Sequence, residues 1–339
     1  MAAVSEARRA HATQPNAAAA LADILAADMQ RVEEEIQRRM QSPVGMIPEI
    51  SDHLVGAGGK RLRPMIAVAA ASLCGYRGDG HVKLAAAVEF IHNATLLHDD
   101  VVDGSELRRG RQAANLIWGN QATVLVGDFL FARSFNLMVE AGSLAALDVL
   151  SRAASVIAEG EVRQLAAMGD VDLTEADYLE IIGAKTAELF AAAAEAPAIL
   201  AGASDEKRQA LASYGRSLGL AFQLVDDALD YAGSTAALGK AVGDDFREGK
   251  MTMPVAAAVR HADAEERAFW TRVMADKEQR EGDLEAALEL VRRHGGVEAT
   301  LVAARAYADS AANVLSVFPP STLRTTMQDL AGFVVSRVS

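Results

Sequence analysis

Apolar positions recur along most of this chain at the spacing of amphipathic helices. The predicted helix over residues 19–41 shows the pattern clearly, because its apolar residues repeat at about 3.6 positions, the period of one helix face. They are Leu21, Leu25, Val32, Ile36 and Met40. Runs in which apolar and polar residues alternate, the mark of strands, are nearly absent. The pattern therefore predicts an all-α protein.

Prolines and glycines divide the chain into helices and loops. Pro43 and Pro48 are expected to end the first helix, and Pro64 to open a helix that runs to Cys74. Glutamates 33–35 are expected to be solvated on the polar face of the first helix. The expected loops are residues 56–63, 75–80, 104–111 and 233–250.

Capping residues place the later helix starts. Asn120, Ser143 and Ser204 are N-cap candidates, and Thr174 with Asp177 forms a capping box. The helices expected after residue 80 cover residues 81–103, 120–141, 143–167, 174–201, 204–231, 252–262, 264–276, 281–294, 297–316 and 320–337. No linker between them is long or polar enough to separate two domains. We therefore expect a disordered tail over residues 1–16 and one helical domain over residues 17–339.

Composition narrows the function classes. Of the 339 residues, 51% are hydrophobic, which supplies a sizeable core, and the net charge of −13 disfavours a nucleic-acid binder. A single cysteine, Cys74, excludes an internal disulfide framework and fits a reducing compartment. No run reaches the roughly 18 apolar residues of a membrane span, and the first residues lack a secretory signal. We expect a cytoplasmic protein with at most peripheral membrane contact.

Two aspartate clusters with one spacing carry the chemistry. DDVVD, residues 99–103, ends one mostly apolar helix, and DDALD, residues 226–230, ends another. Residues four apart share a helix face, so Asp99 lies beside Asp103 and Asp226 beside Asp230. Like charges at that spacing destabilise a helix by roughly 0.2–0.5 kcal/mol, so a cation is expected between them. One cluster alone also fits an exposed polar helix end; the repeated spacing favours a site.

Carboxylate oxygens on a preformed face suit Mg²⁺, which takes one or two carboxylates together with substrate phosphates. Metal ligands are therefore predicted among six residues: Asp99, Asp100, Asp103, Asp226, Asp227 and Asp230. Basic residues accompany the clusters, as a diphosphate substrate would require. They are Lys60, Arg61, Arg63, Arg108, Arg109, Arg111, Lys240 and Lys250.

Competing motifs are incomplete. GSTAALGKA, residues 233–241, differs from a P-loop in glycine spacing and has Ala241 in place of Ser or Thr. GAGG at residues 56–59 does not complete GxGxxG, and there is no HExxH. His92 and His98 lie six apart, which is not the spacing of a helical zinc pair.

These motifs resemble those of the trans-isoprenyl diphosphate (polyprenyl) synthases, in particular the bacterial long-chain type. The resemblance covers about residues 20–335 and rests on GGKRLRP (58–64), FIHNATLLHDDVVDGSELRRGR (90–111), FQLVDDALD (222–230), GAKTAELF (183–190) and LGKAVGDDFREGK (238–250). It implies the isoprenoid synthase fold, a single large bundle of about ten core helices around a central cavity, usually as a homodimer.

The resemblance also implies roles for individual residues. The aspartates would hold two to three Mg²⁺ ions that bridge an allylic diphosphate primer, farnesyl or geranyl diphosphate. The residues implied to assist there are Arg108, Lys185, Thr186, Gln223, Lys240 and Lys250. Those implied to bind isopentenyl diphosphate are Lys60, Arg63, His92 and Arg109. Arg111, Ala241 and Met251 depart from residues common in the family, which puts loop geometry rather than activity in doubt.

Product length should depend on the helix that precedes Asp99. Thr95 and Ala94 lie about one turn upstream, some 6–7.5 Å away, and Ile91 follows along the wall. An aromatic ring often closes the cavity here in short-chain members, so its absence implies a longer product. Phe131, Phe135 and Leu150 are candidates for a deeper floor, although each also fits an ordinary core position. We expect an octaprenyl to decaprenyl product, as used for quinone side chains.

Three alternatives remain at this point. A shorter-chain synthase would make geranylgeranyl or farnesyl diphosphate by the same chemistry. A class I terpene cyclase generally lacks the second DDxxD and the GGKRLRP loop. A non-catalytic subunit of a heteromeric prenyl synthase tends to lose aspartates or loop basic residues, all of which are present here.

Overall fold

Helices account for almost all of the regular structure in the computed structural model, which describes residues 16–56, 58–232 and 242–336. The only strands within these ranges are β1 (Leu107–Arg108) and β2 (Arg111–Gln112), which form a short antiparallel hairpin in the predicted basic loop. The all-α prediction is therefore confirmed. The predicted tail lies outside the described residues except for Asn16, whose side chain caps the first described helix.

The N-terminal helices are α2 (Ala17–Ile24), α3 (Ala26–Met40), α4 (Met46–Gly56) and α5 (Leu62–Leu73). The single helix predicted over 19–41 is divided, because Leu25 leaves the helical conformation. The prediction that Pro48 ends a helix is wrong: Pro48 is the third residue of α4, where the missing N–H needs no partner. Pro64 likewise lies in the first turn of α5.

The central helices are α6 (Gly80–Val102), α7 (Ala114–Glu140), α8 (Leu144–Ala166), α9 (Glu175–Ile182), α10 (Glu188–Leu200) and α11 (Asp205–Tyr231). The caps at Ser143 and Ser204 and the Thr174–Asp177 capping box are confirmed. The helix predicted from Asn120 is continuous with an earlier turn, since α7 starts at Ala114. Gly119, with φ 81° and ψ 160°, kinks α7, so its second part begins at about Asn120.

An irregular turn that the sequence did not predict carries two of the predicted site residues. The helix expected over 174–201 is broken by η1, a π-helical turn at Gly183–Ala187 that joins α9 to α10. Such turns insert an extra residue into an α-helix and are frequent at functional sites. This turn carries Lys185 and Thr186, two of the predicted site residues.

The C-terminal elements are α13 (Asp244–Glu248), α14 (Met253–Arg260), α15 (Ala264–Trp270), η2 (Thr271–Ala275), α16 (Asp283–Arg293), α17 (Gly296–Val314), η3 (Leu315–Val317) and α18 (Thr322–Ser336). Helix α13 lies inside the segment expected to be a loop. Helices α13–α16 enclose a small second core around Trp270.

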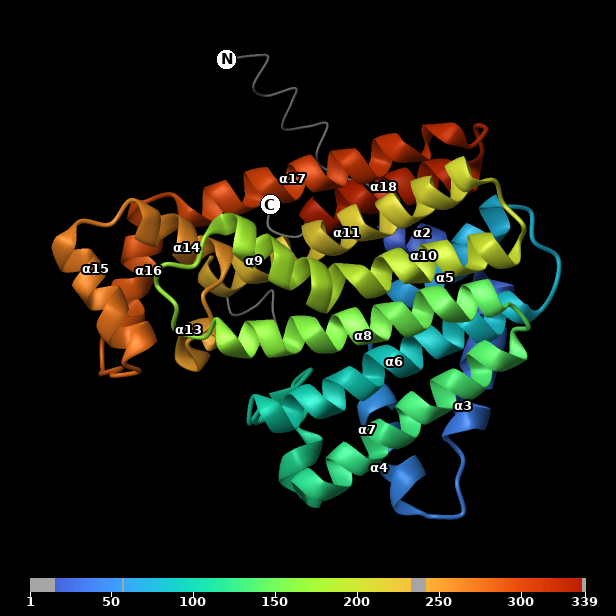
Figure 1. Ribbon diagram of the computed structural model, residues 1–339, viewed down its shortest axis with the longest axis horizontal. Helices are drawn as coiled ribbons and strands as arrows, with labels where there is room; N and C mark the ends of the chain where they lie inside the picture. The colour runs from blue at the N-terminus through green and yellow to red at the C-terminus, as the bar shows by residue number, and fades with distance from the viewer. Residues whose placement is uncertain (1–15, 57, 233–241, 337–339) are drawn as a thin grey trace.

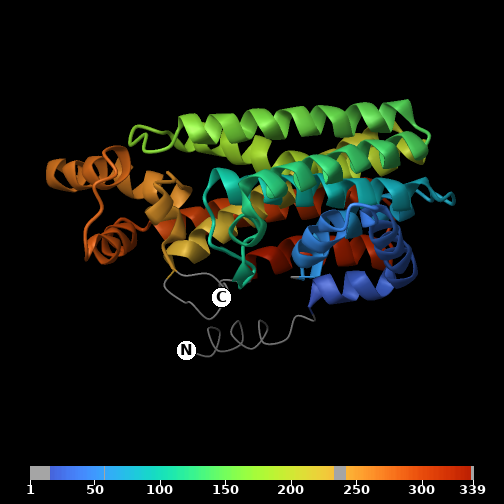
Figure 2. The same ribbon diagram turned by 90° about the horizontal axis from the view of Figure 1, so that it is seen from below.

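The long helices α8, α10, α11 and α17 run side by side along the long axis of the molecule (Figure 1). Their apolar faces, with those of α5, α6, α7 and α18, enclose the main core. Figure 2 shows the N-terminal helices at one end of this bundle and α13–α16 at the other. Helices α6 and α11 are thereby both held in the middle of the bundle, so their aspartate-bearing ends depend on the same core.

Close packing of α11 against the chain segment η1–α10 requires glycine. A Cβ atom at Gly215 would lie 2.2 Å from the carbonyl oxygen of Phe190, and one at Gly219 would lie 2.6 Å from the Cα of Ala187. Real Cβ atoms do not come this close to backbone. The two helices can therefore approach each other only with glycine at these positions.

Gly215→Ala is expected to lower the free energy of unfolding by about 1–3 kcal/mol, since the added methyl group must displace backbone. Gly332→Ala in α18 is the matched control, because a Cβ there meets nothing within 4 Å. Removing a helical glycine at such a site should instead stabilise by about 0.5–1 kcal/mol. Urea unfolding of both variants checks this; an equal response would contradict the close-packing argument.

Candidate active site

The first aspartate cluster ends α6 and divides into accessible and buried members. The side chains of Asp99 and Asp103 are 18% and 22% exposed. Asp100 is buried, and its Oδ1 accepts hydrogen bonds from Nε and Nη2 of Arg108 at 2.8 and 2.5 Å. Arg108 therefore anchors the hairpin to α6, while Asp99 and Asp103 remain accessible to a ligand.

The second cluster ends α11 and divides in the same way. Asp226 is partly exposed, whereas Asp227 and Asp230 are buried. Asp230 accepts the backbone N–H groups of Asp244 at 3.3 Å and Asp245 at 3.1 Å, which holds the start of α13 against α11.

Asp227 is held by a chain of polar side chains. The hydroxyl of Tyr178 donates to its Oδ2, and the Gln223 amide donates to its Oδ1 at 2.7 Å. Thr186 in turn donates its hydroxyl to Gln223 at 2.9 Å. Thr186 and Gln223, both predicted site residues, thus reach the second cluster through Asp227.

Two lysines neutralise the first cluster. Nζ of Lys250 is 3.0 Å from Oδ2 of Asp103 and 2.5 Å from Glu248. Burial favours loss of its proton, but the two carboxylates outweigh this and raise the pKa of Lys250. Nζ of Lys185 is 4.0 Å from Asp99 and donates to Glu161 and Gln164 at 2.7 Å each.

Lys185 owes its position to a close approach between α8 and η1. A Cβ at Gly160 of α8 would lie 2.7 Å from the backbone nitrogen of Lys185. The π-helical turn is therefore wedged between Gly160 on one side and Gly219 of α11 on the other. This packing fixes the backbone that carries Lys185 and Thr186.

A second group of cations surrounds His92 on α6. Arg63 is half-buried, with its guanidinium 4.2 Å from the ring centroid of Phe190 and 3.4 Å from Nε2 of His92. Burial lowers the pKa of Arg63 to about 10. Burial and the nearby Arg63 also hold the pKa of His92 well below its ordinary value, so the imidazole is neutral at pH 7. Arg109 donates to the carbonyl oxygen of Gly58 in the glycine loop.

Several predicted residues have a different place or lie outside the structure. Glu33 is 46% exposed, as expected of a solvated residue, and it also pairs with Arg61 at 3.1 Å. Glu35 departs from the prediction, because it is 12% exposed and pairs with Arg38 and Arg39. Lys60 is exposed. Lys240 and Ala241 lie outside the described residues.

The residues expected to govern product length lie along α6. Ile91 and Ala94 are fully buried, and Thr95 is partly buried with its hydroxyl donating to the carbonyl oxygen of His92 at 2.8 Å. Ala94 presents only a methyl group to the interior of the bundle. A larger side chain there would have to displace its neighbours.

Sequence reasoning missed four polar side chains of the site: Tyr178, Glu161, Gln164 and Glu89. Glu161 also affects the aspartates, since burial and repulsion by Asp99 raise its pKa. No local motif singles these residues out, because each acts on a residue at least 21 positions away.

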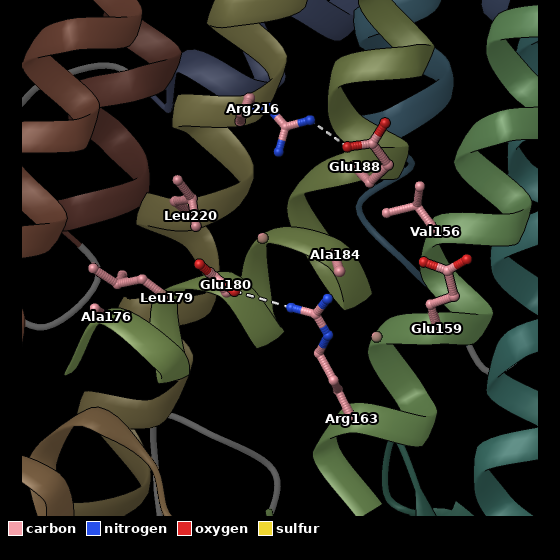
Figure 3. Close-up of a pocket in the computed structure, with 12 residues that line it drawn as sticks. Val156, Glu159, Arg163, Ala176, Leu179, Glu180, Ala184, Glu188, Arg216 and Leu220 are labelled. Carbon is pink, nitrogen blue, oxygen red and sulfur yellow. Dashed lines mark hydrogen bonds and ion pairs between the residues drawn. The ribbon is translucent and has the colours of Figure 1, made fainter. Parts of the chain in front are cut away.

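A cavity of about 690 Å³ is lined by residues of α8, α9, η1, α10 and α11 (Figure 3). Two ion pairs line it, Arg163 with Glu180 at 2.9 Å and Arg216 with Glu188. None of the predicted site residues lines this cavity. The volume of a cavity therefore does not identify the site here. The site is identified by the charged side chains that converge around the aspartate clusters.

The donor set fits a hard divalent cation bound jointly with a substrate. Within residues 16–56, 58–232 and 242–336, no group of three or more Asp, Glu, His or Cys side chains converges to hold a metal by itself. Asp99 and Asp103 offer only oxygen ligands, and burial together with repulsion by Asp103 raises the pKa of Asp99. A cation that also takes phosphate oxygens would relieve this repulsion.

Comparisons with known proteins agree with this geometry. Residues 44–291 match the polyprenyl synthetase family. The chain is 46% identical to octaprenyl diphosphate synthase of Escherichia coli strain K12 over 315 residues, 93% of this chain and 97% of the relative.

Two solved structures superpose closely on the chain, each with a TM-score of 0.92. One is a polyprenyl synthase from Caulobacter crescentus CB15 complexed with calcium and isoprenyl diphosphate, at 56% identity with 95% of this chain and 98% of that one covered. The other is a decaprenyl diphosphate synthase from Rhodobacter capsulatus, at 54% identity with 95% and 99% covered.

Asp227→Asn is expected to stabilise the metal-free protein. Burial raises the pKa of Asp227 from 3.8 to about 6, so the folded state binds the proton more tightly than the unfolded state. The free energy of unfolding therefore falls as the pH rises from about 4 to about 6, and it stays at the lower value above pH 6. The variant should remove this pH dependence and gain about 1–3 kcal/mol at pH 7, at roughly 1.4 kcal/mol per pKa unit.

Denaturant unfolding at pH 5 and pH 7 with a chelator present measures this effect. Asp283→Asn is the control of opposite sign, because hydrogen bonding to Arg272 lowers the pKa of Asp283 to about 2. Its replacement should destabilise at pH 7. The assignment of a buried charge to Asp227 is wrong if Asp227→Asn also destabilises at pH 7.

Proposed function

Because the chain belongs to the polyprenyl synthetase family, we propose that it is an all-trans polyprenyl diphosphate synthase. It condenses isopentenyl diphosphate head-to-tail onto an allylic diphosphate primer, farnesyl or geranyl diphosphate. The observation that carries this is the pair of aspartate clusters at the ends of α6 and α11, with Lys185 and Lys250 beside the first. Such a site binds a metal-bridged diphosphate rather than a neutral ligand.

The allylic diphosphate binds at the carboxylate clusters. Asp99, Asp103 and Asp226 have the exposure to ligate Mg²⁺, while Asp100, Asp227 and Asp230 are predicted ligands that hold the surrounding structure. Two to three Mg²⁺ ions, when bound, neutralise the diphosphate and stabilise it as a leaving group. Lys185, Lys240 and Lys250, with Arg108, Thr186 and Gln223, complete the subsite.

Isopentenyl diphosphate binds at the second cationic group. Arg63, Arg109 and Lys60 hold its diphosphate, since guanidinium groups grip phosphate oxygens in a bidentate manner. His92 is neutral there and can donate one hydrogen bond without adding charge. Both subsites border α6, which places the two substrates on one helix.

The reaction breaks the allylic C–O bond and leaves the electron pair on the departing diphosphate. Lys185 and Lys250 stabilise the charge that develops there, as preorganised cations do in a site shielded from water. The double bond of isopentenyl diphosphate attacks the allylic carbon, and the new C–C bond forms. The released diphosphate accepts the proton that is then lost, so no side-chain base is required.

The product is long, octaprenyl to decaprenyl, and serves as a quinone side chain. This follows the octaprenyl and decaprenyl synthases to which the chain is similar and the small side chain of Ala94. The growing tail passes Thr95, Ala94 and Ile91 along α6. Incubation with Mg²⁺, farnesyl diphosphate and labelled isopentenyl diphosphate tests this: a ladder ending at about eight to ten isoprene units supports it, and no incorporation refutes the activity.

Ala94→Phe is expected to shorten the product to about four isoprene units or fewer, because the ring would block the tail about one turn from Asp99. Chromatography of the dephosphorylated products measures this. Ala86→Phe, also fully buried on α6 but two turns further from Asp99, is the control for general disturbance of the helix. An unchanged product distribution in Ala94→Phe would show that the tail takes another path.

The protein acts as a cytoplasmic homodimer with at most peripheral membrane contact. Of fourteen exposed large apolar side chains among the described residues, five lie on α7 and three on α8. Within the described part of the chain, α7 is the one helix that is long and apolar enough to cross a membrane. A helix whose exposed face is covered by a second subunit can have the same length and composition. Exposed apolar surface of this kind marks an interaction site.

Leu125→Glu is expected to convert the dimer to a monomer. The Leu125 side chain is 67% exposed on α7, and a glutamate buried there in an interface would be a charge without a partner. Sedimentation velocity measures the mass of both proteins. Val302→Glu, 63% exposed on α17, is the matched control and should leave the dimer intact. A wild-type protein that sediments as a monomer would refute the dimer.

A further inference from the structure

The glycine loop that carries Lys60 and Arg63 is fixed through Arg61, which directly follows Lys60. Arg61 has φ 47°, a left-handed conformation that residues with a Cβ rarely adopt. Its guanidinium forms ion pairs with Glu89 of α6 and, at 3.1 Å, with Glu33 of α3. Three helices thus meet at this side chain, and the strained turn is held by ion pairs rather than by the loop itself.

Glu89 is buried, with 3% of its surface exposed. It also accepts a hydrogen bond from the amide of Asn93 at 3.4 Å. A carboxylate so deeply buried is costly unless cations compensate it. Here its surroundings are strongly cationic, and the charge of Glu89 favours the protonated forms of Arg61, Arg63 and Arg109.

We propose that Glu89 is a positioning residue for the isopentenyl diphosphate subsite, an inference that rests on the function proposed above. It sets the loop through its ion pair with Arg61, and its charge offsets the repulsion between the half-buried Arg63 and the exposed Arg109. Glu89 does not contact the substrate; it holds the groups that do.

This role differs from a general contribution to stability in its kinetic effect. Loss of Glu89 should weaken binding of the homoallylic diphosphate, because the loop that carries Lys60 and Arg63 would lose the ion pair that anchors it to α6. The allylic subsite uses other residues, at the C-terminal end of α6, and should be unaffected. A purely structural residue would change activity for both substrates together or only the amount of folded enzyme.

Steady-state kinetics of Glu89→Gln in the full chain with Mg²⁺ tests this. The KM for isopentenyl diphosphate should rise about tenfold or more, while the KM for farnesyl diphosphate stays within about twofold. Glu89→Asp keeps the charge and should recover the KM for isopentenyl diphosphate to within about threefold. Glu35→Gln, which breaks a partly buried ion pair elsewhere on α3, is the control and should leave both KM values unchanged.

Glu89→Gln with a folded circular dichroism spectrum and an unchanged KM for isopentenyl diphosphate would overturn the proposal, as would an equal rise in both KM values. If Glu89→Gln does not fold, Arg61→Gln replaces it, because it removes the same ion pair from the loop side. It should raise the KM for isopentenyl diphosphate alone, and no rise would overturn the proposal. A wild-type enzyme that incorporates no isopentenyl diphosphate would instead refute the proposed function.

Discussion

The repulsion among carboxylates at the ends of α6 and α11 is the constraint on which the rest of the site depends. Half of the six aspartates are buried and held by protein groups: Asp100 by Arg108, Asp227 by Tyr178 and Gln223, and Asp230 by backbone N–H groups. Their bonds lock the ends of both helices in place. The other three therefore remain rigidly placed and accessible, which is the arrangement a shared cation requires.

Lysines from distant parts of the chain compensate the charge of the accessible aspartates. Two local features of the fold hold these lysines in position. Lys185 comes from a π-helical turn wedged between glycines of α8 and α11, and Lys250 comes from the segment that follows α13. Asp230 holds α13 by backbone hydrogen bonds, so one carboxylate of the site positions the segment whose lysine neutralises another. The site is thus coupled to the packing around it, and substitutions such as Gly215→Ala and Asp227→Asn report on that coupling.

Local signals allowed much of this to be predicted. The caps at Ser143 and Ser204, the capping box at Thr174 and the i, i+4 aspartates involve residues three or four apart, so the sequence contains the whole interaction. Pairs distant in sequence could not be found this way: Tyr178 reaches Asp227 across 49 residues, and Arg61 reaches Glu89 across 28. The sequence did not predict the π-helical turn, whose close neighbours Gly160 and Gly219 lie on other helices.

The two proposed diphosphate subsites have opposite electrostatic requirements on the same helix. At the C-terminal end of α6, lysines compensate an excess of carboxylates. About two to three turns earlier, Glu89 compensates an excess of guanidinium groups, and His92 stays neutral. Each subsite therefore contains its own counter-charge before substrate arrives, which lets charged groups remain ionised while partly buried. A diphosphate that binds as proposed would meet charges already fixed in position, so its binding would cost little reorganisation and one helix would align both substrates.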